Sequence, residues 1–229
     1  MKHLLSALAL ACIATTARAQ VAGHLPENSP YRDLETSQEF TFFGGHYTTG
    51  KDPIGIAPLD GPMYGLRYQI HVGGPAFLMA RWSHVNSSRF AIDPTKTGTA
   101  RQLGKQNVPV NLFDFDLALN LTGEKSFHHF VPVINFGAGL ATCGCSFGAD
   151  PYTFGTPFAF TFGGGLKYVP GGRFQLTVDW SDYLYQLKYP TAYYVTPTSG
   201  TAAVTGNQAR SFWKNNRALT FGASLLFFR

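Results

Sequence analysis

Ser83 and His84 are adjacent residues whose types could carry out covalent chemistry. Serine acyl transfer needs a nucleophile, a base and an orienting group within hydrogen-bond reach of one another. Asn86 and two further serines follow closely, but there is no Asp or Glu between His84 and Asp93. Because serine and histidine are common loop residues, we favour a structural interpretation and predict no catalytic residue here.

Charged residues form a second group with chemical potential, since they recur at alternate positions of segments that are otherwise apolar. Projection onto one face of extended segments brings together three cations and three carboxylates: Arg67, Arg81, Lys167, Asp114, Asp116 and Asp179. Isolated buried charge is very costly, so we expect these groups to pair in a network that closes a narrow interior to solutes. A charged selectivity constriction in a small pore is the alternative.

Four glycines share that predicted inner face and leave space beside them. They are Gly137, Gly139, Gly163 and Gly165. The space could receive a large side chain such as Tyr183 or Arg81, or the glycines could permit bulges and curvature of the sheet. A pocket for a lipid chain is the sharper hypothesis.

Two cysteines, Cys143 and Cys145, are separated only by Gly144. In an oxidising compartment they favour a small disulfide, or one bond to a partner chain. Free thiols and metal binding are the alternatives, although a metal would need further ligands, and only Asp150 lies near. We therefore predict no metal and no cofactor.

The elements that must position these residues are β-strands, because apolar and polar residues alternate with period two. Each strand has about the nine to eleven residues that cross a bilayer at a tilt. The expected strands are 39–47, 63–72, 76–84, 108–121, 130–141, 158–169, 173–185 and 218–228.

The final strand shows the alternation most clearly. Its apolar side chains occupy one continuous face, at Leu219, Phe221, Ala223, Leu225 and Phe227. The opposite face carries small and polar residues, as expected for a strand with one side against lipid and the other against a polar interior.

The links between strands alternate in length, which a β-sandwich would have no reason to do. Short turns are expected at 73–75, 122–127 and 170–172, and long polar loops at 48–62, 85–107, 142–157 and 186–217. Short turns at one end and long loops at the other are typical of outer membrane barrels.

The first residues predict export. Lys2 and His3 precede the apolar run 4–14, and Ala17-Arg18-Ala19 stands before Gln20, as in a cleaved secretory signal. The run is too short to span a bilayer as a helix. We therefore divide the chain into a signal peptide at 1–19, a periplasmic segment at 20–38 and a β-barrel at 39–229. A helix beginning near 29–34 or a loose tail is expected within the periplasmic segment.

Composition agrees with one barrel. Removing the signal takes away two of 18 basic residues and leaves 16 against 13 acidic residues, a net charge of +3. This balance is too weak to indicate nucleic-acid binding. The 34 aromatic residues (3 Trp, 11 Tyr and 20 Phe) are enough for girdles at both membrane interfaces.

Together these features resemble the small eight-stranded outer membrane proteins, the outer membrane protein A-like barrel group, over residues 39–228. The resemblance is one of architecture, and Arg229 after the final Phe228 departs from it. It implies an all-β, eight-stranded antiparallel up-and-down transmembrane barrel in a Gram-negative outer membrane. Implied partners are outer membrane lipid and lipopolysaccharide, and the barrel assembly machinery through the C-terminal strand. We expect a monomer, without a peptidoglycan-binding domain.

We expect a structural or surface-interaction role through the external loops, with a surface ligand there and a closed lumen. The alternative is a narrow channel or transporter for small solutes or apolar ligands. Some barrels of this group modify lipid A as acyl hydrolases or transferases, but the order Ser83-His84 departs from the deacylase pattern His-x-Ser-Asn. The longest loop, 186–217, is the expected contact surface, unless its aromatic rings rest on the membrane or on neighbouring loops.

Overall fold

The computed structural model describes residues 29–34, 37–198, 200–205 and 210–227. The predicted signal peptide at 1–19, most of the predicted periplasmic segment and Arg229 therefore lie outside the described residues. Within the described part of the chain, no helix has the length and apolarity needed to cross a membrane.

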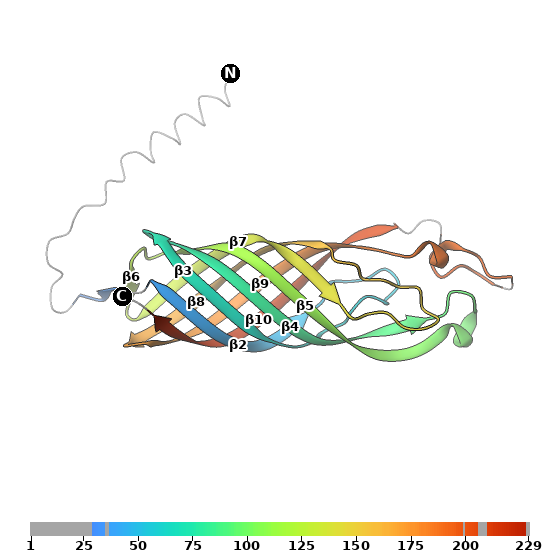
Figure 1. The fold of residues 1–229 in the computed structure, drawn as a ribbon, viewed down its shortest axis with the longest axis horizontal. Helices are drawn as coiled ribbons and strands as arrows, with labels where there is room; N and C mark the ends of the chain where they lie inside the picture. Colours follow the sequence, from blue (N-terminus) through green and yellow to red (C-terminus); the bar gives the residue numbers. More distant parts are fainter. Residues whose placement is uncertain (1–28, 35–36, 199, 206–209, 228–229) are drawn as a thin grey trace, which may run out of the picture.

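Eight long antiparallel strands form a closed barrel (Figure 1). Each strand pairs with the next long strand of the chain, and the last strand pairs with the first over eleven residue pairs, from Arg217↔Thr48 to Phe227↔Gln38. The predicted fold class is confirmed. The strands are β2 Gln38–Thr48, β3 Gly61–Gly73, β4 Ala76–Ile92, β5 Gln102–Asn120, β7 Phe130–Cys143, β8 Phe158–Gly171, β9 Phe174–Lys188 and β10 Ser211–Phe227.

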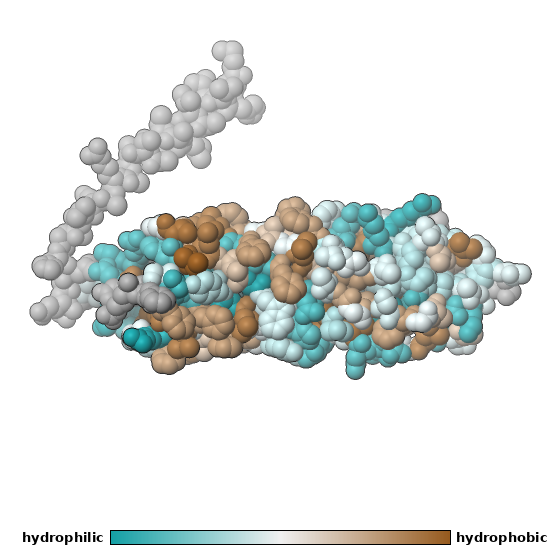
Figure 2. All heavy atoms as spheres, in the orientation of Figure 1, coloured by the Kyte–Doolittle hydropathy of each residue, from teal (hydrophilic) through white to brown (hydrophobic). Residues whose placement is uncertain are grey.

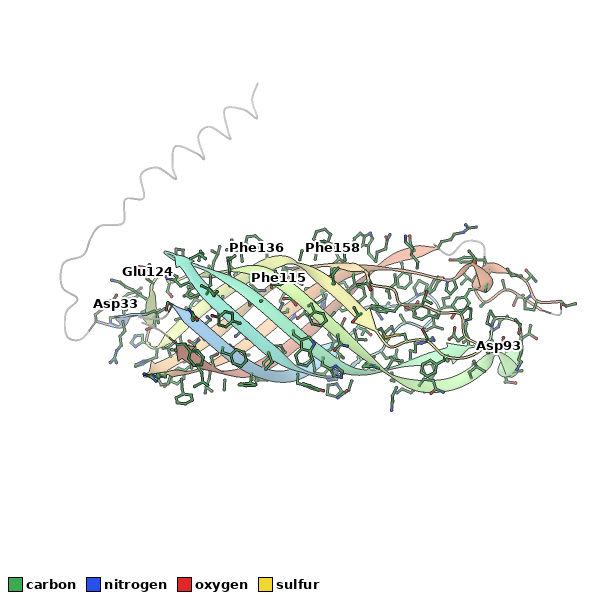
Figure 3. All side chains as sticks on the ribbon, viewed as in Figure 1. Asp33, Asp93, Phe115, Glu124, Phe136 and Phe158 are labelled. Atoms are coloured by element: carbon green, nitrogen blue, oxygen red, sulfur yellow. A yellow bond between two sulfur atoms is a disulfide. The ribbon has the colours of Figure 1, made fainter. Side chains whose placement is uncertain are left out.

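The outer face of the barrel is an apolar belt. In β10, Phe221 is 59% exposed, whereas Ser224, on the opposite face, is 1% exposed. Figure 2 shows apolar residues gathered over the half of the barrel that holds the short turns. Phe115, Phe136 and Phe158 point away from the barrel wall (Figure 3), and Phe115 is 74% exposed. Such a surface matches lipid rather than water.

Several strands continue beyond the predicted ends, at the end of the barrel that carries the long loops. β4 runs to Ile92 and β10 begins at Ser211, so the predicted limits at 84 and 218 are wrong. The long loops shrink accordingly to 93–101 and 189–210. Beyond the apolar belt the outer face meets water and need not be apolar. The strands therefore stay paired there although their residues no longer alternate between apolar and polar, which is the pattern that predicts a strand. Two short 3₁₀ turns, η1 Gly98–Arg101 and η2 Thr191–Tyr194, lie in these loops.

A small two-stranded addition lies at the opposite end, which holds the short turns. β1 (Tyr31–Asp33) pairs antiparallel with β6 (Lys125–Phe127) in the turn before β7. The expected helix start in this segment is therefore wrong, because backbone pairing with a sheet edge takes the place of local helical bonds. The pairing carries Leu34 against a buried cluster that includes Phe77 and Val131.

The interior is filled in three layers between the two ends of the barrel. The turn end holds the small apolar cluster of Phe77, Ala118, Val131 and Val133. The loop end holds a larger cluster, rich in tyrosine, to which both strands and loops contribute. Buried charged and polar side chains occupy the space between them.

Placing a charge on the lipid-facing wall tests the membrane-spanning assignment. Phe115→Arg should lower the free energy of unfolding in lipid vesicles by about 2–4 kcal/mol, because arginine near the bilayer midplane is that unfavourable on a barrel wall. Phe115→Leu is the matched control and should cost much less. Denaturant titration in phospholipid vesicles measures both values, and an unchanged stability of the arginine variant would contradict the lipid-facing assignment.

Candidate functional site

Arg81 on β4 is the centre of the charged layer. Its Nε donates to Asp114 Oδ2 at 2.9 Å, and its Nη2 lies 3.2 Å from Asp116 Oδ2. The remaining nitrogen, Nη1, donates to Ser181 Oγ at 2.9 Å. The guanidinium also lies 5.3 Å from the centre of the Tyr183 ring. One planar cation therefore connects β4 with β5 on one side and with β9 on the other. Its hydrogen bonds to the carboxylates are charge-assisted and are therefore stronger than those between neutral groups.

Asp116 receives further hydrogen bonds from the neighbouring strands. Asn135 on β7 donates its Nδ2 to Asp116 Oδ2 at 2.8 Å. The hydroxyl of Thr161 on β8 donates to the other carboxylate oxygen. These donors satisfy a carboxylate that is 3% exposed, which removes most of the cost of burying it.

A second ion pair joins β3 to β9. Arg67 Nη1 donates to Asp179 Oδ2 at 2.9 Å, and Nη2 donates to Thr177 Oγ1 at 3.3 Å. The same guanidinium lies 3.8 Å from a carboxylate oxygen of Glu39 on β2. Arg67 thus links strands on opposite sides of the barrel, separated by more than 100 residues in sequence.

Lys167 does not pair with any of the three predicted carboxylates. Its Nζ lies 2.6 Å from Glu39 Oε2 and 2.8 Å from Gln69 Oε1. Ser224 donates to Glu39 Oε1 at 2.9 Å, and Thr41 donates to the same atom at 3.1 Å. The network accordingly has four carboxylates against three cations.

Glu39 is the network residue that the sequence reasoning missed. The signal was present, because Glu39, Thr41 and Phe43 occupy alternate positions of β2 and all three are buried. The apolar residues Phe40 and Phe42 between them occupy the outer face. The alternation is less regular after Phe43, where Gly44 and Gly45 follow, so the inner face of this strand is harder to assign from sequence.

Neighbouring side chains and backbone occupy the space beside the four glycines. A Cβ on Gly139 would lie 2.7 Å from the Cα of Asp114, and one on Gly163 would lie 2.9 Å from Oδ1 of Asn135. Gly137 and Gly165 similarly face the carboxylates of Asp116 and Asp179. These contacts leave no room for a lipid chain at the glycines, so the pocket hypothesis is wrong there. Gly137 and Gly165 instead admit two carboxylates of the network.

Ser83 and His84 lie on opposite faces of β4. Ser83 is fully buried inside the barrel, whereas His84 lies on the outer face. The two ring nitrogens of His84 lie 2.8 Å from Asn111 Oδ1 and 3.2 Å from Asn86 Oδ1. Successive side chains of a strand point in opposite directions, so this histidine cannot activate this serine.

A further buried ion pair, which the sequence reasoning did not identify, lies at the loop end. Arg89 on β4 and Asp150 in the loop 144–157 are both fully buried, with Nη1 and Oδ2 2.8 Å apart. Arg89 Nε donates to the carbonyl oxygen of Cys145 at 3.0 Å, and its guanidinium lies 4.7 Å from the centre of the Tyr152 ring. Both residues lie beyond the apolar belt, where a face-alternation argument does not apply.

Asp150 also gathers donors from other segments. The backbone N–H of Ile92 donates to its Oδ2 at 3.0 Å, and that of Tyr152 donates to its Oδ1 at 3.0 Å. The phenol of Tyr193, from the loop 189–210, donates to Asp150 as well. Burial and this hydrogen bond hold the pKa of the Tyr193 phenol well above its usual range, so the phenol remains a donor at any physiological pH.

A further loop, 49–60, joins the same assembly. Asp52 accepts the backbone N–H of Ile56 at 2.7 Å and that of Ala57 at 2.6 Å. The phenol of Tyr189 donates to the same carboxylate. We call the loops 49–60, 144–157 and 189–210, with the outer end of β4, the cap. Its buried residues continue the larger interior cluster.

The cysteine pair lies at the edge of the cap. The structure joins Cys143, the last residue of β7, to Cys145 by a disulfide. The carbonyl oxygen of Cys145 is the one that accepts from Arg89. Among the residues that the structure describes, no group of three or more His, Cys, Asp or Glu residues could hold a metal ion.

Comparison with models of protein families and with curated proteins finds no match. Solved structures do match over most of the chain. Neisserial surface protein A (NspA) aligns with a TM-score of 0.53 and 9% identity, covering 83% of this chain and 97% of that one. The outer membrane protein OprG from Pseudomonas aeruginosa aligns with a TM-score of 0.52 and 11% identity, covering 86% of this chain and 99% of that one.

Likeness at this level of identity establishes the fold. The closed ring of eight strands, its apolar outer belt and these alignments define a small bacterial outer membrane β-barrel. Outer membrane barrels carry short periplasmic turns and longer external loops, and we name the two ends of this barrel accordingly.

Removing the central cation tests the network. Arg81→Met should cost about 3–5 kcal/mol of stability, because it leaves Asp114 and Asp116 buried together without their positive partner. Asp114→Asn should cost less, since Arg81 then still faces Asp116. Denaturant titrations of the refolded barrel in detergent micelles compare the two variants, and equal small losses would show that the network does not hold the interior.

Proposed function

We propose that this protein is a structural or surface-interaction barrel of the bacterial outer membrane, whose lumen is closed and whose external cap presents a contact surface. The observation that carries the proposal is the fully buried pair of Arg89 and Asp150, which holds loops inside the external mouth. A segment that had to admit solutes would not be secured by a buried charge pair, because breaking such a pair is strongly unfavourable.

Closure is supported at the other levels of the barrel as well. The charged groups of the middle layer bond mainly to one another and to nearby polar side chains. At the periplasmic mouth, Leu34 packs against the small apolar cluster, and the cavity beside it holds only about 20 Å³. A barrel of eight strands is just wide enough for its side chains to fill.

The remaining assignments follow from this proposal. We propose that residues 1–19 direct export, that β10 carries the signal for assembly into the membrane, and that the barrel is monomeric. Outer membrane lipid and lipopolysaccharide would then surround the apolar belt. An acyl-transfer enzyme is not proposed, since Ser83 and His84 lie on opposite faces of β4.

Electrical recording tests closure of the lumen. The mature chain, residues 20–229, should produce no discrete current steps after refolding in detergent and insertion into a planar bilayer. Circular dichroism and heat-dependent electrophoretic mobility show that the sample is folded, and a conducting porin in the same bilayer shows that steps would be detected. Reproducible steps from the folded barrel would contradict closure and support a narrow channel.

Limited proteolysis tests the role of Arg89 in the cap. Arg89→Met leaves Asp150 buried without a partner and should destabilise the cap by about 3–5 kcal/mol, so the loops should be cleaved faster while the barrel stays folded. Lys96→Met is the matched control, because the Lys96 side chain is exposed where it pairs with Asp93 at 3.5 Å and its loss should leave the rate unchanged. Equal cleavage rates for both variants and the wild type would contradict the assignment.

A further inference from the structure

The longest loop contains a cavity whose described lining includes no residue of the charged network and neither member of the Arg89–Asp150 pair. It has a volume of about 560 Å³ and opens outward from the loop 189–210 at the external end. Its lining combines one aromatic ring, one cation, three threonine hydroxyl groups and an aliphatic side chain: Tyr194, Arg210, Thr196, Thr201, Thr205 and Val204.

Hydrogen bonds from outside the cavity hold its walls in place. Arg101, at the end of η1, donates to the carbonyl oxygens of Thr201 and Ala202, the latter at 3.4 Å. The backbone N–H of Val204 donates to the carbonyl oxygen of Tyr193 at 2.9 Å. Tyr193 in turn donates to the buried Asp150. The cavity is therefore built on the cap and is anchored to a second loop.

The described lining of the cavity carries one cation, Arg210. The guanidinium of Arg210 lies 5.4 Å from the centre of the Tyr194 ring, and its backbone carbonyl accepts the N–H of Tyr189 at 3.1 Å. Arg210 is exposed, and none of the described residues that line the cavity is acidic. The guanidinium of Arg101 adds a second cation behind the wall. Stacking on a ring orients an arginine while its N–H groups remain able to bind a planar anion.

We infer that this cavity binds an acidic saccharide, with its carboxylate or sulfate group on Arg210. An arginine fork suits a planar carboxylate, and the threonine hydroxyls can both donate to and accept from sugar hydroxyls. An apolar ligand fits less well, because among the described lining residues only Val204 and Ala202 carry aliphatic side chains. The volume is of the size that small-ligand sites have.

This inference rests on the proposed function in one respect, since it needs the loop 189–210 to face the outside. The two fail separately. Current steps would overturn the closed lumen without affecting saccharide binding, and absence of binding would overturn this inference without opening the lumen.

The experiment titrates the refolded full-length mature barrel with trigalacturonate, using calorimetry or NMR chemical shifts. The neutral trisaccharide of galactose is the matched ligand, because it lacks only the carboxylate charge at each unit. We expect trigalacturonate to bind and the neutral sugar to bind at least about tenfold more weakly, as loss of a hydrogen bond to a charged group implies. Added salt should weaken the binding of trigalacturonate.

Variants locate the site. Arg210→Gln should weaken trigalacturonate about tenfold or more, and Thr201→Val should weaken it to a smaller extent. Lys188→Gln is the matched control, because Lys188 is an exposed cation at the outer end of β9 and does not line the cavity. Its affinity should stay within about twofold of the wild type. Unchanged electrophoretic mobility shows that each variant is folded.

Three outcomes would overturn the inference. The first is failure of trigalacturonate to bind the folded wild type. The second is an equal loss of affinity in Arg210→Gln and Lys188→Gln, which would indicate diffuse attraction to the external surface. Equal affinity for inorganic sulfate and for trigalacturonate would indicate an anion site without saccharide recognition.

Discussion

The rest of the structure depends on how the narrow interior of the barrel satisfies its buried charges. Three cations and four carboxylates lie in the middle layer, and each cation spans strands that are distant in sequence, as Arg67 does with Asp179 at 2.9 Å. Breaking one such pair leaves an uncompensated charge in a space with little water, which is costly. The network therefore links strands across the ring as well as filling its middle layer.

The two halves of the interior use different solutions for the same space. Within the apolar belt, charged groups pair across the lumen and glycines give their carboxylates room. Beyond the belt, the strands enclose aromatic and aliphatic side chains, and the loops fold inward over them. The interior changes from polar to apolar because the outer face changes. Where lipid covers the wall, the apolar residues of each strand face outward and the polar residues face the interior.

The cap turns the external end into a fixed surface. Arg89 and Asp150 form an ion pair that is buried from solvent. Tyr193 and Tyr189 connect the longest loop to two others by donating to the carboxylates of Asp150 and Asp52. A fixed surface loses less conformational entropy when it binds a partner than a mobile loop does. This agrees with the proposed role in contact at the cell surface, and the same loop supplies the hydrogen-bonded walls of the cavity beside Arg210.

Alternation of residue types by itself determined the eight strands, their lipid-facing sides and the inward position of six charged residues, because period two is a local property of the chain. It did not determine the ends of β4 and β10, which continue into water where the outer face no longer needs to be apolar. Only the closed ring decided that Lys167 meets Glu39 and that Arg89 meets Asp150, since these partners are 128 and 61 residues apart. Sequence assigns a side chain to a face, whereas its partner is set by the tilt and closure of the barrel.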